Sequence, residues 1–299
     1  MMSRGYLYYA HNNGIINYLK IAICSALTGK HFLNNFNATI ITDKHSYDSL
    51  EKEDVKLFEK CFDNVVFQNS FYENNDNQRP VIAGYSNLGK HAWWNKSRPN
   101  AFNDTPYDET ILVDVDYIFQ DNNTDKLWGS KVPLKMNKDM IPLGVNRLKD
   151  QYISIEDQRV STFTIPMYWA TLVYFRKDQF TNDFFNLVNH IKDNYLAYCY
   201  VYNINNTMYR NDFAFSIALY MMNGSIRPSQ EYELPFKYVL ATSEARIHQL
   251  GEHTTRFLFP AKGEKEPWQY LNLQDISYHC MNKISLQEHY NTFLHFYGK

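Results

Sequence analysis

The first part of the chain alternates between short apolar runs and segments in which apolar residues have helical spacing. Residues 5–10, 38–43 and 64–68 are apolar and rich in β-branched and aromatic side chains, which predicts three short strands. Apolar residues recur every three to four positions over 15–27 and 49–61, which predicts two amphipathic helices. Strands that alternate with helices indicate an α/β half with a parallel sheet, of the kind that binds nucleotides.

Residues 110–119, TILVDVDYIF, form an apolar and β-prone run that contains two aspartates. Apolar residues on both sides of the pair predict a strand that is buried on both faces. Because side chains alternate along a strand, Asp114 and Asp116 would point to the same side, with Val115 opposite. Two buried carboxylates are costly unless they share a proton or a cation, and Mg²⁺ or Mn²⁺ suits such oxygen ligands. The pattern favours a divalent metal site over its alternative, a solvated edge strand.

The second half of the chain is more irregular. Residues 167–177 predict a strand, and the spacing of Phe184, Leu187 and Ile191 predicts a helix. A further helix is expected from Asp212 to about Met222 and is ended by Gly224. No linker rich in proline, glycine or serine separates the halves, so we expect a single unit.

Composition and charge narrow the class of protein. The 30 basic and 32 acidic side chains give a formal net charge of −2, without the basic excess that binds nucleic acid or membrane surfaces. The four cysteines lie far apart without a CxxC pair, which favours buried thiols and a reducing cytoplasm. No apolar run reaches the length of a membrane span, so we expect a soluble protein without a membrane partner. The sequence gives no indication of oligomeric state.

One short motif suggests a phosphotransferase. GYSNLGKH at 84–91 nearly matches the phosphate-binding loop pattern GxxxxGK[ST]. His91 stands where that pattern requires a hydroxyl group for Mg²⁺, and the segment follows a loop instead of a strong strand. A P-loop phosphotransferase is therefore the weaker hypothesis.

A broader resemblance links the chain to the GT-A-type glycosyltransferases, in particular to the retaining galactosyltransferase and glycogenin-like family. AHNNGIINYLKIAICSAL resembles its first strand-to-helix passage, ATIITD its second strand, and RPNAFNDTPYDETILVDVDY the stretch that ends in its DxD motif. MYWATLVYFRK resembles its N-x-G-V-x-x-F segment, and HCMNK its C-terminal His-to-Lys motif. The compact, Asn- and Tyr-rich chain also resembles glycosyltransferases of tailed phages, in which case it would act in the host cytoplasm.

This resemblance implies a GT-A-type, Rossmann-like α/β fold with a mixed, mainly parallel sheet flanked by helices. It also implies one domain over 1–299, in which 1–120 bind the nucleotide sugar and 121–299 bind the acceptor. The implied reaction moves a hexosyl or pentosyl group from a nucleoside-diphosphate sugar, with UDP as the expected nucleotide, to an acceptor hydroxyl. Mn²⁺ or Mg²⁺ would bind the diphosphate as a Lewis acid.

The family's functional residues carry over by position. The nucleoside would contact Ala10, Asn12, Asn13 and Asp43, the diphosphate Lys96 or Arg98, the metal Asp114, Asp116 and His279, and the departing phosphate Lys283. Three features depart from the family: Ile15 stands where a tyrosine is common, Thr171 stands where a glycine is usual, and the His-to-Lys gap is short. Base and sugar specificity therefore stay open.

Several residues keep two interpretations. Asp212 either caps the helix that follows it or acts on the acceptor side in catalysis. Asp43 either lines the nucleoside or caps a turn, and His279 is either a ligand or a histidine bonded to a backbone carbonyl. Trp93 and Trp94 form either a stacking platform or a half-buried pair.

The acceptor stays open as well. It is either a saccharide or other small hydroxyl compound, or a hydroxymethylated base in phage DNA. For the DNA acceptor, the cationic stretch Lys126, Lys131, Lys135 and Lys138 is the candidate contact surface, with a solvated loop as the alternative. A sugar-nucleotide-binding protein without turnover is the hypothesis from a different class.

Overall fold

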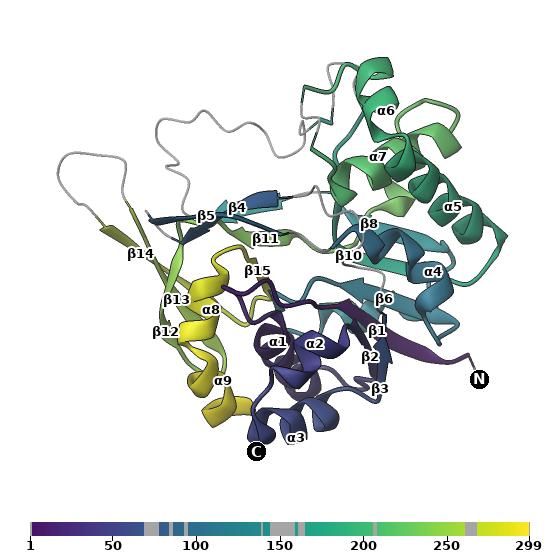
Figure 1. The fold of residues 1–299 in the computed structure, drawn as a ribbon. Helices are drawn as coiled ribbons and strands as arrows, with labels where there is room; N and C mark the ends of the chain where they lie inside the picture. Colours follow the sequence, from purple (N-terminus) through teal and green to yellow (C-terminus); the bar gives the residue numbers. More distant parts are fainter. Residues whose placement is uncertain are drawn as a thin grey trace.

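A six-stranded sheet forms the centre of the computed structural model, with helices on both of its faces (Figure 1). The sheet has the order β3-β2-β1-β6-β10-β8. The structure describes residues 2–68, 78–83, 86–92, 95–138, 140–143, 159–160, 165–205, 208–260 and 268–298. Trp93 and Trp94 lie outside these ranges.

The first half has the expected alternation of strands and helices. Its elements are β1 (Arg4–Tyr9), α1 (Tyr18–Phe32), β2 (Ala38–Thr42), α2 (Lys44–Asp48), α3 (Lys52–Cys61) and β3 (Asn64–Phe67). The helix expected from residue 15 begins at Tyr18, because the Asn17 side chain accepts a hydrogen bond from the Lys20 N–H and caps it. The short helix α2 was not expected; Asp43 caps it by accepting a hydrogen bond from the Ser46 N–H.

The sheet is mixed and mainly parallel, as expected. β1 pairs in parallel with β2 and with β6 (Glu109–Val113), and β2 pairs in parallel with β3. β10 (Trp169–Arg176) runs antiparallel to both of its neighbours, β6 and β8 (Leu134–Asn137). The strand expected over 167–177 is thus the one strand of this sheet that runs in the opposite direction.

The prediction of one continuous strand over 110–119 is wrong. β6 ends at Val113, a turn follows, and β7 (Tyr117–Ile118) belongs to a second sheet of order β7-β15-β11-β9. Apart from the two aspartates, the run is mainly apolar because it stays buried while it passes from one sheet to the other: Val115, Tyr117 and Ile118 all lie in the core. Asp114 and Asp116 therefore lie in the connection between two sheets.

The two faces of the central sheet contact different helices. Tyr6 and Tyr8 of β1 share a hydrophobic cluster with α1, whereas Leu7 and Tyr9 share another with α5 (Gln179–Asp193) and α7 (Asn211–Met222). This alternation along β1 is the two-residue period of a strand buried on both faces. Figure 1 shows the two sets of helices on opposite sides of the sheet.

Two short helices accompany the second set, α4 (Ala101–Asp104) and α6 (Tyr195–Val201). α5 begins with a capping box. The Asp178 side chain accepts a hydrogen bond from the Thr181 N–H, and the Thr181 hydroxyl accepts one from the Asp178 N–H. A 3₁₀ helix, Asn95–Asn100, precedes α4.

The C-terminal part adds the second sheet, a three-stranded antiparallel sheet and two helices. The second sheet contains β9 (Met140–Leu143), β11 (Tyr238–Ala241) and β15 (Tyr278–Cys280) besides β7. The antiparallel sheet has the order β12 (Arg246–Leu250), β13 (Thr254–Pro260) and β14 (Trp268–Gln274). α8 (Lys283–Glu288) and α9 (Tyr290–Tyr297) pack against α1.

The P-loop hypothesis does not fit this fold. Residues 86–92 form strand β5, which pairs antiparallel with β4 (Gln78–Ala83), whereas a phosphate-binding loop leads into a helix. Cys24, Cys61, Cys199 and Cys280 are all buried free thiols, as expected. Among the helices of the described ranges, none combines the length and the apolar character that crossing a bilayer requires.

Close packing at Gly29 generates a stability prediction. A Cβ atom at Gly29 in α1 would lie 2.3 Å from the ring of Phe36, which stacks on Tyr6 at a centroid distance of 4.7 Å. In a helix, alanine is more favourable than glycine by about 1 kcal/mol of free energy, but overpacking a core costs about 1–3 kcal/mol. We expect Gly29→Ala to lower the free energy of unfolding by about 1 kcal/mol in urea denaturation.

The control is the same substitution in a Phe36→Ala background. There the ring is absent, and Gly29→Ala should raise the free energy of unfolding relative to Phe36→Ala alone. A stabilising effect of Gly29→Ala in the otherwise natural chain would contradict the packing argument.

Candidate active site

The predicted site residues of the first half follow the carboxyl ends of three strands. Ala10 follows β1, Asp43 follows β2 and Asp114 follows β6, so all three lie at one edge of the parallel sheet. The chain proceeds from β1 to β2 on one side and continues with β6 on the other side of β1. Open α/β sheets bind ligands at the carboxyl edge beside such a switch in strand order.

Asp114 is held by the strand and by an arginine. Its N–H donates to the carbonyl of Thr171 at 2.9 Å, and its carboxylate accepts a hydrogen bond from the guanidinium of Arg98. Arg98 is 2% exposed and also donates to the carbonyl of Ala170. The arginine therefore ties the DxD turn to the start of β10.

Asp116 is the more deeply buried of the two aspartates in the DxD turn, at 3% exposure. Its Oδ2 lies 2.8 Å from Nε2 of His279 and 2.5 Å from Nζ of Lys283. Its backbone carbonyl accepts a hydrogen bond from the N–H of Cys280 at 2.9 Å, where β15 pairs with β7. The structure thus brings the C-terminal histidine and lysine to the aspartate pair across more than 160 residues of sequence, as predicted.

Two hydroxyl groups orient the His279 ring from its other side. The Tyr238 hydroxyl hydrogen-bonds with Nδ1 of His279, and the Thr171 hydroxyl lies 3.4 Å from the same nitrogen and 3.1 Å from the Tyr238 hydroxyl. Thr171 had been noted only as a departure from the family pattern. Tyr238 was missed, because it lies in an ordinary apolar strand segment that gives no signal for a polar contact.

The electrostatics of the two aspartates differ. Burial raises the pKa of Asp114 against the opposing effect of Arg98, and the nearby Asp116 raises it further. Burial also acts to raise the pKa of Asp116, but His279 and Lys283 outweigh it and hold this pKa below the ordinary value. Burial acts to lower the pKa of Lys283, but Asp116 raises it above the usual range. Asp116 and Lys283 therefore form a carboxylate–ammonium pair at neutral pH.

Asp212 lies beside this cluster and is not the N-cap of its helix. Arg210 occupies the N-cap position of α7 without a side-chain capping bond, and Asp212 lies in the first turn. Its carboxylate accepts hydrogen bonds from the N–H of Ala170 and from the Arg210 guanidinium, each at 2.9 Å. Asp212 also contributes to the raised pKa of Asp114, which puts its charge within electrostatic range of the metal-ligand candidates.

A break in strand register, similar to a β-bulge, explains why Ala170 is available to both sides of the site. The pairing of β10 with β8 shifts register between Trp169 and Val173. The shift leaves the Ala170 N–H for Asp212 and its carbonyl for Arg98. Bulges occur next to active sites because they redirect backbone groups in this way.

The nucleoside candidates lie close together, and each of the four has a structural partner. The Asn12 side chain donates to the Ser49 hydroxyl at 2.9 Å, and the Asn13 side chain accepts from the N–H groups of the turn that follows it. Asp43 is 1% exposed and caps α2 through Ser46, which was one of its two interpretations. Ala10 is buried and bonds the Ile41 carbonyl.

His11 is a buried polar residue that sequence reasoning missed. It lies between Ala10 and Asn12, is 6% exposed, and interacts electrostatically with Asp43. Burial lowers its pKa to about 4 although Asp43 acts to raise it. Its position inside a stretch already assigned to the nucleoside was the available signal.

The two predicted diphosphate residues lie in different surroundings. Arg98 is buried against Asp114, as described above, whereas Lys96 is partly exposed. Burial lowers the pKa of Lys192 in α5, and the nearby charge of Lys96 lowers it further. In the cationic stretch after β7, Lys135 donates to the carbonyl of Glu231, and Lys138 is buried 3.5 Å from the Glu233 carboxylate. Lys126 and Lys131 are the exposed members of that stretch.

The donor set of Asp114, Asp116 and His279 fits a divalent cation. Each residue offers one ligand atom, and the three atoms lie within 4.8 Å of one another. Two carboxylates and one imidazole suit Mn²⁺, whereas Mg²⁺ prefers oxygen ligands throughout. With the proton of His279 on Nδ1, this nitrogen donates to the Tyr238 hydroxyl and leaves Nε2 for a metal, which is the support that metal-binding histidines commonly have.

Comparisons with known proteins give structural similarity only. No protein-family model matches the chain, and neither does any curated protein. Similar solved structures include the glycosyltransferase GlyE of Streptococcus pneumoniae TIGR4 (10% identity, TM-score 0.40, 74% of this chain and 43% of that chain). They also include the galactosyltransferase LgtC in complex with donor and acceptor sugar analogs (13%, 0.42, 72% and 70%) and mouse xyloside xylosyltransferase 1 (9%, 0.43, 77% and 83%).

All three are glycosyltransferases by name, the class that the sequence resembles. The chain spans less than half of the GlyE chain that it matches. Similarity at this level assigns neither an activity nor the role of any residue.

The buried histidine generates a prediction about pH. The pKa of His11 is about 4 in the folded chain and about 6.5 in the unfolded chain, so between these values the unfolded state binds more protons. The contribution of neutral His11 to the free energy of unfolding is therefore fully present above pH 6.5. It falls by ~3 kcal/mol as the pH is lowered toward 4. We expect His11→Gln to flatten the pH dependence of the free energy of unfolding over this range.

His45→Gln is the matched control, because His45 is exposed on the neighbouring helix α2. It should leave the pH dependence as it is in the natural chain. Equal slopes for His11→Gln and the natural chain in urea denaturation at pH 7, 6, 5 and 4 would contradict the burial argument.

Proposed function

We propose that the chain is a metal-dependent glycosyltransferase that moves a sugar from a nucleoside-diphosphate sugar, with UDP as the nucleotide, to an acceptor hydroxyl. The observation that carries the proposal is the convergence of Asp114, Asp116 and His279 within 4.8 Å of one another, with Lys283 beside them. Residues 1–120 bind the donor and 121–299 bind the acceptor, and the second half also supplies His279 and Lys283. The free thiols are consistent with action in the cytoplasm, or in the host cytoplasm for a phage-encoded protein.

The chemistry requires positive charge where the diphosphate departs. Mn²⁺ or Mg²⁺ bound to Asp114, Asp116 and His279 supplies Lewis-acid stabilisation of the phosphate oxygens. Lys283 adds a second charge: its side chain is 22% exposed, so it is able to turn from Asp116 toward a phosphate at the sheet edge. Asp116 raises the pKa of Lys283 against the effect of burial and keeps it protonated before it turns, and the negative charge of a phosphate would do the same afterwards.

Arg98 has a different role in this proposal. It is 2% exposed and bonded to both Asp114 and the Ala170 carbonyl, so reaching a phosphate would cost two buried hydrogen bonds. We infer that Arg98 orients Asp114 and compensates its charge. Lys283 is then the residue that contacts the leaving group.

Asp212 is the candidate for contact with the acceptor. Its carboxylate lies beside Asp114 at the same edge, while one of its bonds goes to Arg210, a partly exposed side chain. We favour a saccharide acceptor over DNA, because three of the four lysines in the cationic stretch are engaged with carbonyl or carboxylate groups of the chain itself.

The metal role is tested with Asp116→Asn. The substitution keeps the size of the side chain but removes the charge that holds His279, Lys283 and the metal. We expect the Mn²⁺-dependent rate of donor turnover to fall ~100-fold or more, which corresponds to about 3 kcal/mol of lost transition-state stabilisation. The readout is release of the nucleoside diphosphate from a panel of nucleotide sugars, with and without Mn²⁺.

Asp193→Asn is the control, since this carboxylate is exposed at the end of α5. It should keep full turnover. Comparable Mn²⁺-dependent turnover in Asp116→Asn would overturn the proposed metal site. Donor binding in a thermal-shift assay without any turnover would favour a sugar-nucleotide-binding protein instead.

The acceptor class is tested by salt dependence. A DNA acceptor requires phosphate contacts, and each contact steepens the fall of affinity with rising salt. With duplex DNA that carries hydroxymethylated cytosine, we expect no gel retardation at low or physiological salt. Retardation at low salt that Lys126→Ala and Lys131→Ala together reduce would contradict a saccharide acceptor and support DNA.

A further inference from the structure

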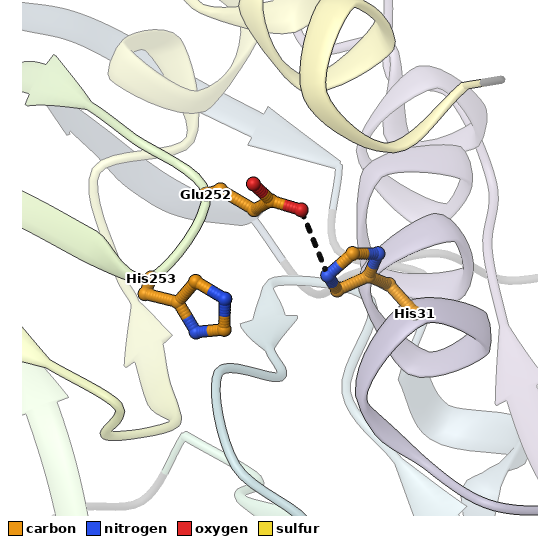
Figure 2. A group of neighbouring side chains, drawn as sticks. All are labelled: His31, Glu252 and His253. Carbon is orange, nitrogen blue, oxygen red and sulfur yellow. Dashed lines mark ion pairs between the residues drawn. The ribbon is translucent and has the colours of Figure 1, made fainter.

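A second group of potential metal ligands lies away from the candidate active site. His31 is in the last turn of α1, and Glu252 and His253 lie in the turn between β12 and β13. Figure 2 shows the three side chains converging from the helix and the turn. Each offers one ligand atom, and these atoms all lie within 4.8 Å of one another.

We propose that His31, Glu252 and His253 bind Zn²⁺ and that the ion clamps the end of α1 to the β12–β13 turn. Two imidazoles and one carboxylate form a donor set that zinc accepts, with solvent in the fourth position. Ligand atoms 2.0–2.2 Å from a tetrahedral ion lie about 3.3 Å apart. Nε2 of His31 and Oε1 of Glu252 already lie 3.3 Å apart.

A carboxylate behind His253 prepares this residue as a ligand. Nδ1 of His253 lies 2.8 Å from Oδ1 of Asp275, and the N–H of Asp275 donates to the His253 carbonyl at 2.9 Å. Asp275 reaches this position with a φ of 50°, in the left-handed region that few residues other than glycine adopt. A carboxylate on one ring nitrogen fixes the tautomer that presents the other nitrogen to a metal. In Figure 2 the other ring nitrogen faces the space between Glu252 and His31.

The elements that carry the ligands are held in place independently of any ion. The Tyr297 hydroxyl of α9 donates to the Glu252 carbonyl at 2.7 Å, which fixes the turn. The His31 ring packs edge-on against Tyr297 at a centroid distance of 5.2 Å, and Phe32 packs against His253 at 5.4 Å. A rigid surround lowers the entropy cost of ordering the ligands when an ion binds.

The local field and the solvent exposure also suit a cation. His31 lies at the carboxyl end of α1, where the helix dipole favours positive charge. The ligand side chains are 32% (His31), 50% (Glu252) and 55% (His253) exposed, so an ion and a water molecule have access. Without an ion, the His31–Glu252 contact is a surface pair that contributes about 0–1 kcal/mol, so these residues have little structural importance on their own.

The proposal is tested by zinc binding and by zinc-dependent melting. We expect the natural chain to gain thermal stability on addition of Zn²⁺, and His31→Gln or His253→Gln to lose this gain while keeping the melting temperature of the metal-free chain. The variants should fold, because all three side chains are exposed. Asp275→Asn should weaken zinc affinity about tenfold in calorimetric titration, because it removes the charge behind His253.

His279→Gln separates this site from the candidate active site, and His45→Gln controls for the loss of a surface histidine. Both should retain the zinc-dependent gain in melting temperature. Affinity for Zn²⁺ that is unchanged in a His31→Gln/His253→Gln double variant would overturn the proposal. A binding curve whose affinity does not fall below pH 6 would also overturn it, because zinc competes with protons for histidine.

Discussion

The junction between the central sheet and the second sheet depends on the buried carboxylate of Asp116. A charged carboxylate at 3% exposure is stable only with opposite charge beside it; Lys283 supplies this charge and His279 adds a hydrogen bond, both from the other end of the chain. The same residue's backbone carbonyl pairs with Cys280, so charge compensation and strand pairing reinforce each other. β15 and the start of α8 are thereby fixed at the carboxyl edge of the central sheet. A fold that lost the C-terminal pair would leave Asp116 with an uncompensated charge.

Elements with clear periodicity could be predicted from the sequence, and the path between them could not. β1, β2 and α5 lie where their apolar pattern predicts them, because each packs against apolar neighbours. β3 also lies where it is predicted, although it is a largely exposed edge strand. The prediction of one strand over 110–119 was wrong because hydrophobicity indicates that a residue is buried but not to which sheet it belongs. Leu112 lies in the central sheet and Ile118 in the second one. The short helix α2 depends on a single cap at Asp43, a signal too local to separate from a turn.

In the candidate active site, too, some residues could be predicted from the sequence and others could not. The aspartate pair was singled out because charged residues on an apolar background need a reason, and His279 and Lys283 because HCMNK resembles a family motif; the structure brings the four residues together. Their supporting residues give no such signal: Tyr238 lies in an apolar strand, and the Ala170 backbone becomes available only through a bulge. The sequence identified Arg98 as a cation that could contact the diphosphate, but it did not identify Asp114 as the partner of Arg98. Spacing along the chain does not distinguish a phosphate contact from a buried pair with a carboxylate. Distance in the fold, which the sequence does not contain, decides between the two.

The charge balance of the site links the metal to the donor. In the structure each aspartate has a full cationic partner, Asp114 with Arg98 and Asp116 with Lys283. A divalent ion alone would add two positive charges to this balanced set, and it would compete with Lys283 for the same Oδ2 atom. A diphosphate that arrives with the ion brings the negative charge that restores the balance and gives Lys283 a new partner. If the site has the function proposed above, this charge balance would favour binding of the ion together with the nucleotide over binding of the ion alone, since only the combined ligand leaves no buried charge uncompensated.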